Sequence, residues 1–207
     1  METGDIDAGD TKNWNSGRGF DPIGRLNRTG NGVTGSFSGA FDGMGHSIQN
    51  LYIRQIGNQY DGYIGLFEGI GKGGSVGNVN MAGGHIEGMS NFGSIAGLNW
   101  GTIYNIVNSA ELVCSSGGVG GIVGTNGGVI RNAVNNGTLK IDGRSGGITG
   151  YNGDTVWGNT GILLDVKNNG DITSESMGGI GGITGINSSG SSITGAENTG
   201  LVELKYG

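Results

Sequence analysis

Cysteine, proline and histidine are nearly absent from this chain of 207 residues, which contains 1, 1 and 2 of them. The single cysteine, Cys114, excludes an internal disulfide and a metal site built from several cysteines. We expect it to be a small buried residue of a strand over residues 111–114. The two histidines, His46 and His85, form no His-Glu-x-x-His pattern, which excludes a metallopeptidase site of that type within this chain.

Basic residues and long apolar runs are also scarce. The chain has 11 Lys and Arg against 17 Asp and Glu, a net charge of -6, and its basic residues are scattered. Binding to nucleic acid depends on clustered Lys and Arg, so we predict no nucleic-acid partner. No apolar run approaches the roughly 20 residues of a membrane span. The start of the chain lacks the basic and apolar regions of a signal peptide.

Glycine, by contrast, is abundant: there are 50 glycines, against an ordinary share of roughly 7%. Collagen and disordered glycine-rich tracts contain many prolines, and this chain has 1. The glycines also recur in step with Ile, Leu and Val, which a flexible linker does not require. We therefore expect an ordered, periodic chain.

The periodicity is clearest around the segment Gly-Gly-Ile-Val-Gly-Thr-Asn at residues 120–126. Related segments occupy residues 93–99, 146–152 and 181–187, with a looser copy at 64–69. The spacing is 27 positions from Ser94 to Gly121 and 26 from Gly121 to Gly147. A fixed period of this size indicates a repeat architecture.

Each repeat reads as three short strands separated by Gly and Asn, with no segment of helical period. We therefore predict an all-β fold, a parallel β-helix (β-solenoid) of about five to six coils with one repeat per coil. A first column of inward-facing residues would contain Ile95, Ile122, Ile148 and Ile183, with Leu66 in the coil before them. A second inward column would contain Ile103, Ile130 and Ile193. At one corner, stacked side-chain amides would form a ladder of Asn99, Asn126, Asn152 and Asn187.

The two ends of the chain differ from the repeats. Residues 1–36 are expected to form an N-terminal tail and cap, in which Trp14 and Phe20 cover the first coil; the alternative is a sugar-stacking surface. Residues 37–207 form the solenoid. The last strand, 201–206, is followed by no capping segment, so we expect the natural polypeptide to continue into further domains.

Alternating acidic residues near the start raise the alternative of a calcium site. Asp5, Asp7 and Asp10 could supply carboxylate ligands from a tight turn, but the later bidentate Glu of a calcium loop is missing. The preferred interpretation is a solvated turn, with no metal and no cofactor.

The best candidate for ligand contact is an insertion in the fifth coil. The spacing from Gly147 to Gly182 is 35 positions, and the excess falls at residues 153–160. Insertions in solenoids form loops on one face, often the binding face. Trp157 is therefore predicted to contact a ligand, with Tyr151 and Asp154 beside it. The alternative is that Trp157 folds back onto the coil.

The repeated Gly-Ile-x-Gly at 121–124, 147–150 and 182–185 resembles the GLUG motif (Gly-Leu-any-Gly). That repeat occurs in large bacterial surface proteins, including adhesin-like proteins and the non-catalytic arm of streptococcal IgA-cleaving metallopeptidases. Residues 14–24 and 37–53 look like the lead-in that commonly precedes such repeats. Ile replaces Leu in these copies, Ser94 replaces the first Gly of one, and Glu68 the last Gly of another. The resemblance implies a surface or secreted setting and a β-solenoid, and it implies no catalytic residue.

Three functions are compatible with these patterns. The preferred one is a non-catalytic segment of an extracellular or bacterial cell-surface protein, acting as stalk and adhesion surface for a host glycan or an extracellular-matrix protein. A polysaccharide-active enzyme would need carboxylates and basic groups gathered on one face, whereas most Asp residues here adjoin turn glycines. A trimeric tail fibre of a phage or contractile machine is the third.

Overall fold

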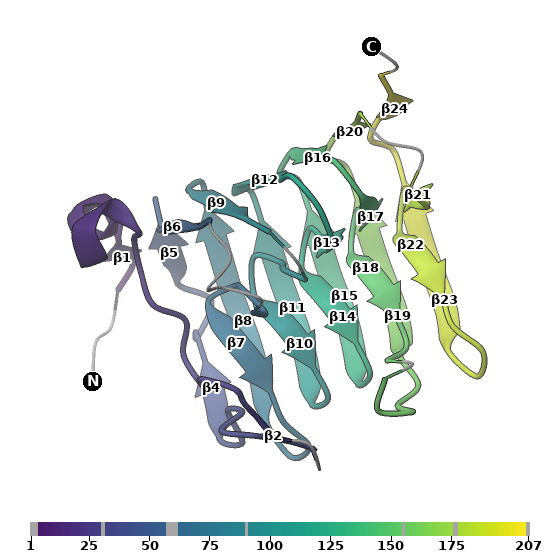
Figure 1. Cartoon of the computed structure of the whole chain (residues 1–207), viewed down its shortest axis with the longest axis horizontal. Helices are drawn as coiled ribbons and strands as arrows, with labels where there is room; N and C mark the ends of the chain where they lie inside the picture. Colours follow the sequence, from purple (N-terminus) through teal and green to yellow (C-terminus); the bar gives the residue numbers. More distant parts are fainter. Residues whose placement is uncertain are drawn as a thin grey trace.

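The computed structural model describes residues 4–29, 32–56, 62–89, 91–154, 156–175 and 178–205. Within these residues the chain is almost entirely β, with two short 3₁₀ turns, η1 (Gly9–Asn13) and η2 (Asn15–Gly17), near the N-terminus. Figure 1 shows successive coils stacked side by side from the N-terminal to the C-terminal end. The predicted all-β parallel solenoid is confirmed.

Three parallel sheets run the length of the solenoid. The first contains β1 (Ile6–Asp7), β4 (Ala40–Asp42), β5 (Ser47–Gln49), β8 (Ser75–Ala82), β11 (Thr102–Asn108), β15 (Val129–Asn135), β19 (Ile162–Asn168) and β23 (Ser192–Asn198). The second contains β7 (Phe67–Ile70), β10 (Ala96–Asn99), β14 (Val123–Asn126), β18 (Thr149–Asn152) and β22 (Thr184–Asn187). The third contains β6 (Tyr52–Gln55), β9 (His85–Gly88), β12 (Glu111–Cys114), β16 (Leu139–Ile141), β20 (Ile172–Ser174) and β24 (Val202–Leu204).

Two smaller sheets complete the fold. A short parallel sheet joins β13 (Gly118–Gly120), β17 (Arg144–Gly146) and β21 (Ile180–Gly181), so the later coils carry a fourth strand that the sequence did not indicate. An antiparallel hairpin joins β2 (Asn27–Thr29) and β3 (Gly32–Thr34).

The core is a set of columns, each with one apolar side chain per coil. The predicted column is confirmed: Ile95, Ile122 and Ile148 are fully buried, and Ile183 packs against the same cluster in the last coil. The second predicted column also forms, but Leu163 lies between Ile130 and Ile193 in the register. Sequence spacing missed Leu163 because the insertion before it displaces the repeat.

The long strands of the first sheet bend at one residue each. Asn78, Asn105, Asn132 and Asp165 have φ between 52° and 54°, the left-handed region that few residues other than Gly, Asn and Asp adopt readily. These positions are skipped in the pairing, since Tyr104 pairs with Arg131 and Ile106 with Ala133. The bend therefore turns the strand around the core and leaves its central residue facing outward.

Buried asparagines join the coils at two corners. In the predicted ladder, Asn99 Nδ2 donates to Asn126 Oδ1 at 2.8 Å, and this pattern continues through Asn152 to Asn187 at 3.0 and 2.8 Å. A second ladder, which was not predicted, runs through Asn108, Asn135, Asn168 and Asn198, with distances of 2.7, 2.8 and 2.7 Å. These amides satisfy buried corner groups as well as linking coils, because most of them bond the backbone two residues ahead; Asn152, which precedes the insertion, instead donates to the carbonyl of Ser192.

The N-terminal segment lies along the first coil, where β1 pairs with β5. Phe20 packs against the core as expected, and Leu26 is buried over Gly69. The prediction that Trp14 covers the first coil is wrong, since Trp14 is 50% exposed. The backbone reverses directly after it through Asn15 and Ser16, at φ 52° and 60°, and the core contact passes to Phe20.

Candidate functional site

The insertion lies at the corner between β18 and β19. Asn126 pairs with Asn152 and Val129 pairs with Ile162, so the extra residues fall between Asn152 and Ile162. Gly153 begins this segment at φ 107°, and the backbones of Asp154 and Asn159 pair across it. We call the segment from Gly153 to Thr160 the corner loop; Thr155 lies outside the described residues.

Asp154 organises the corner loop. Its side chain accepts hydrogen bonds from the backbone N–H groups of Val156 at 3.0 Å and Trp157 at 3.2 Å, and from Nε1 of Trp100 at 2.9 Å. The residue is only 3% exposed. A buried carboxylate that accepts three hydrogen bonds has a structural role. Asp154 therefore fixes the backbone of Val156 and Trp157 and links the corner loop to Trp100.

Trp100 reaches this loop because the intervening coil has a glycine at the same phase. A Cβ at Gly127 would lie 3.0 Å from Cδ1 of Trp100 and 3.2 Å from Cβ of Asp154. The Trp157 ring meets the Trp100 ring edge to face, at 6.3 Å between centroids and an interplanar angle of 81°. Sequence reasoning missed Trp100; the signal was a tryptophan directly after a ladder Asn, where the next two coils have glycine.

For Trp157 the structure shows the second of the two alternatives, folding back onto the coil, and leaves part of the side chain exposed. Trp157 folds back onto Trp100, yet 38% of it remains exposed, and the neighbouring Val156 is 74% exposed. The corner loop therefore presents two apolar side chains on a support that is fixed by hydrogen bonds. Such a preordered surface loses little conformational entropy when it binds a ligand.

Tyr151, the third predicted residue, has different neighbours. It lies in β18, where its ring crosses the backbone of Gly118 and its hydroxyl accepts a 3.1 Å hydrogen bond from Arg144. The Arg144 guanidinium also lies over the ring, at 5.9 Å. The structure thus brings Asp154 and Trp157 together and ties Tyr151 to β13 and β17.

The acidic residues near the N-terminus hold backbone turns. Asp5 accepts a hydrogen bond from the Ser47 N–H, and Asp7 accepts one from the Gly9 N–H, which together with Asn50 lowers the pKa of Asp7. Asp10 borders an open groove with Asp7. Among the described residues, no three His, Cys, Asp or Glu side chains gather in a way that could hold a metal ion. Cys114 is buried, in agreement with its expected role.

A strip of charged and aromatic side chains crosses the third sheet. His85 stacks on Tyr52 at 5.6 Å between ring centroids, and its Nδ1 lies 3.1 Å from Glu111. Lys140 pairs with Glu111 at 2.6 Å, and Arg54 pairs with Glu87 at 2.8 Å. The sequence did not indicate this strip, because its members meet only through the register of successive coils.

Comparison with known proteins gives one partial similarity. Over 105 residues, 51% of this chain, it is 35% identical to halomucin of Haloquadratum walsbyi (strain DSM 16790 / HBSQ001). The matched region is 1% of halomucin, so this chain spans a very small part of that protein. No family model matches the chain, and no solved structure matches it. In the described part of the chain, no helix is long and apolar enough to cross a membrane.

Proposed function

We propose that this chain is a non-catalytic β-solenoid segment of a longer cell-surface or secreted protein, in which it is a stiff spacer and a binding surface. The observation that carries the proposal is the corner loop, where a buried Asp154 holds Trp157 and Val156 in an exposed position. Exposed aromatic and aliphatic groups on a rigid support are typical of binding surfaces.

The stack of coils supports the spacer role. Each interior strand is hydrogen-bonded on both sides, and buried amide ladders link neighbouring coils at two corners. Such a structure has few open backbone groups along its length, which makes it resistant to bending and proteolysis. The partial similarity to halomucin, and the resemblance to GLUG repeats, both favour a segment of a much longer polypeptide.

The adhesive part of the proposal is tested by screening the isolated chain against arrays of glycans and extracellular-matrix proteins. Trp157→Ala removes the exposed ring of the corner loop. Trp14→Ala is the control, because Trp14 is also exposed, at 50% against 38% for Trp157, but lies in the N-terminal segment between η1 and η2. We expect a specific hit that Trp157→Ala loses and Trp14→Ala keeps.

Two results would count against this proposal. A well-folded chain that binds nothing on either array would leave only the spacer role. Substrate-specific turnover of a polysaccharide by the isolated chain would instead replace the whole proposal with an enzymatic function.

A further inference from the structure

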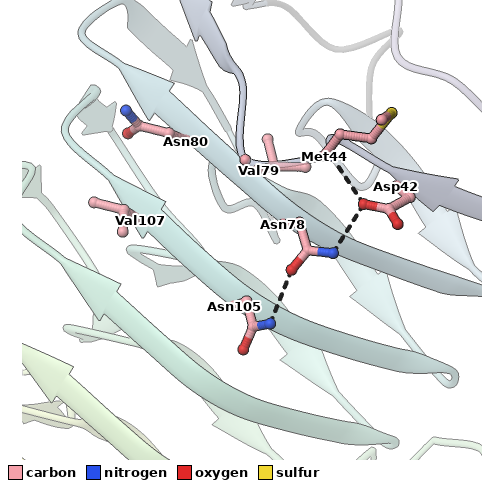
Figure 2. A pocket seen from close by; sticks show the side chains of 8 residues that line it. Asp42, Met44, Asn78, Val79, Asn80, Asn105 and Val107 are labelled. Atoms are coloured by element: carbon pink, nitrogen blue, oxygen red, sulfur yellow. Dashed lines mark hydrogen bonds between the residues drawn. The ribbon is translucent and has the colours of Figure 1, made fainter.

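The outer face of the first sheet carries an exposed polar ladder. Asn132 Nδ2 donates to Asn105 Oδ1 at 3.1 Å, Asn105 Nδ2 to Asn78 Oδ1 at 2.8 Å, and Asn78 Nδ2 to Asp42 Oδ1 at 2.8 Å. Figure 2 shows the part of this outer ladder from Asp42 to Asn105. It differs from the two corner ladders in facing solvent, and its hydrogen bonds run toward the N-terminal end.

The outer ladder borders an open groove across three successive elements. The groove is lined by the Asp42–Gly45 turn with Met44, by Asn78, Val79 and Asn80 of β8, and by Asn105 and Val107 of β11. Met44 is 62% exposed and Val107 37% exposed. An apolar surface thus lies beside a row of hydrogen-bonding groups, and Figure 2 shows both from the same side.

The ladder amides keep unused hydrogen-bonding capacity. An Asn side chain has two N–H donors and two acceptor lone pairs. Within the described residues, Asn78 and Asn105 each use one donor and one acceptor in the ladder. The remaining donor and acceptor on each side chain recur once per coil, at about 4.8 Å.

The ladder is also held in place before any ligand arrives. The backbone at each Asn is fixed in the left-handed region, and each side chain is bonded to its neighbours. A ligand would therefore not have to order these side chains on binding.

We propose that this groove and the outer ladder bind an extended neutral glycan that lies along the solenoid axis. Two neighbouring hydroxyl groups of a sugar can donate and accept hydrogen bonds at the same time, as a side-chain amide does. Each sugar residue of an extended chain adds a length close to the spacing between successive coils. The C–H face of a sugar would pack on Met44 and Val107. The proposal rests on the proposed binding role of the solenoid but places a ligand at a site separate from the corner loop.

Charge selects a neutral glycan over an acidic one. Exposed carboxylates lie at both ends of the outer ladder, Asp42 at one and Asp165 at the other, and the chain has a net charge of -6. Uronic acids or sulfates along this line would face like charges. Arg131, which precedes Asn132 of the outer ladder in the sequence, has its guanidinium over the Tyr104 ring, at 4.9 Å from the ring centroid.

The test uses the ¹⁵N-labelled chain and follows the Asn side-chain amides by NMR during titration with cellohexaose, xylohexaose or mannohexaose. At least one of them is expected to shift the amides of Asn78 and Asn105. Asn105→Gly is the informative variant: glycine adopts positive φ without strain, and Gly195 already holds the equivalent position at φ 65°. We expect it to weaken binding at least tenfold in calorimetry, whereas Asn169→Ser, on another exposed corner, leaves the affinity unchanged.

Several outcomes would overturn this inference. They are the absence of any shift up to the solubility limit of all three sugars, equal affinity in Asn105→Gly, and tighter binding of hexagalacturonate than of the neutral sugars. Binding that Trp157→Ala abolishes and Asn105→Gly does not would also overturn it, but would support the corner loop. The two proposals can therefore fail separately.

Discussion

The indole Nε1 of Trp100 donates a 2.9 Å hydrogen bond to Oδ2 of Asp154, 54 residues further along the chain. The bond crosses one complete coil, which has Gly127 at the crossing point. It joins the only inserted corner among the described interior coils to the body of the solenoid. The position of Trp157 depends on this bond, because Asp154 also accepts the Trp157 N–H.

Replacing Trp100 by Phe tests that bond. The ring stays, but the buried carboxylate of Asp154 loses its indole donor, which we expect to destabilise the chain by about 1–3 kcal/mol. Hydrogen exchange should accelerate at Val156 and Trp157 more than in β10 or β14. The control is Trp14→Phe at an exposed ring, for which no change is expected. Unchanged exchange in the corner loop would show that Asp154 does not need Trp100.

Replacing Gly127 by Ala tests the crossing point. The new Cβ would lie 2.8 Å from Cβ of Asn159 and 3.0 Å from Cδ1 of Trp100, so the corner loop and the indole have to separate. We expect a loss of about 1–3 kcal/mol in unfolding free energy and a change in tryptophan fluorescence. Gly158→Ala is the comparison within the loop, since its Cβ meets nothing nearby, although its φ of 70° adds some strain. Equal stability of Gly127→Ala and the wild type would contradict the packing described.

Replacing Asn135 by Asp tests the buried ladder. Asn135 is fully buried and donates to Asn168 Oδ1, so an aspartate would place two acceptors face to face in a dry site. We expect a loss of several kcal/mol at neutral pH. Burial would raise the folded-state pKa of the new carboxyl, so the variant should regain stability as the pH falls toward 4, relative to the wild type. Asn169→Asp, at an exposed position, should lack this pH dependence in thermal melts.

For Glu111 we expect a smaller dependence of stability on pH, opposite in sign to that of Asn135→Asp. Hydrogen bonds from Lys140 and then His85 lower its pKa from the ordinary value of 4.5. Because the folded-state pKa of Glu111 lies below the ordinary value, the stabilisation is fully present above that ordinary value and is lost as the pH falls through the folded pKa. Glu111→Gln should therefore lower the melting temperature at pH 6–7 and have little effect below the folded pKa. The Glu111 side chain is 35% exposed, so the change should be small and weaken with salt. The same difference at every pH would refute the assignment.

Asn105 separates backbone from side-chain effects. At φ 52°, alanine has the left-handed penalty of about 1 kcal/mol, whereas glycine does not. We therefore expect Asn105→Ala to be less stable than Asn105→Gly by that amount in denaturant melts, although both remove the amide. The reverse order would show that the left-handed backbone at this position does not disfavour alanine.

Sequence repetition was sufficient to predict much of the fold. A period of 26 or 27 residues, with Ile and Asn at constant phases, predicted the Ile122 column and the Asn126 ladder, and both are present. The ladder through Asn135 was equally periodic but was not recognised, since its Asn follows an apolar strand without a glycine motif. Leu163 was missed because the insertion shifted the count.

The candidate site was less accessible from the sequence. Spacing located the corner loop, but it could not place Trp100 beside Asp154, because their meeting depends on the stacking register and on the absence of a side chain at Gly127. For the same reason Tyr151 was grouped with Trp157, although its ring lies with Arg144.

The sequence by itself determined the architecture: repeated apolar residues can be buried only if equivalent strands stack, and repeated glycines and asparagines form the corners. The tertiary structure decided which outward-facing residues meet. Neighbours across the outer surface, such as Asn78 with Asn105 or His85 with Glu111, lie about one coil apart in sequence, and their contacts depend on side-chain direction and on the room left by glycines. Burial restricts the inward positions to apolar residues, whereas at outward positions the sequence does not show which side chains of neighbouring coils are in contact.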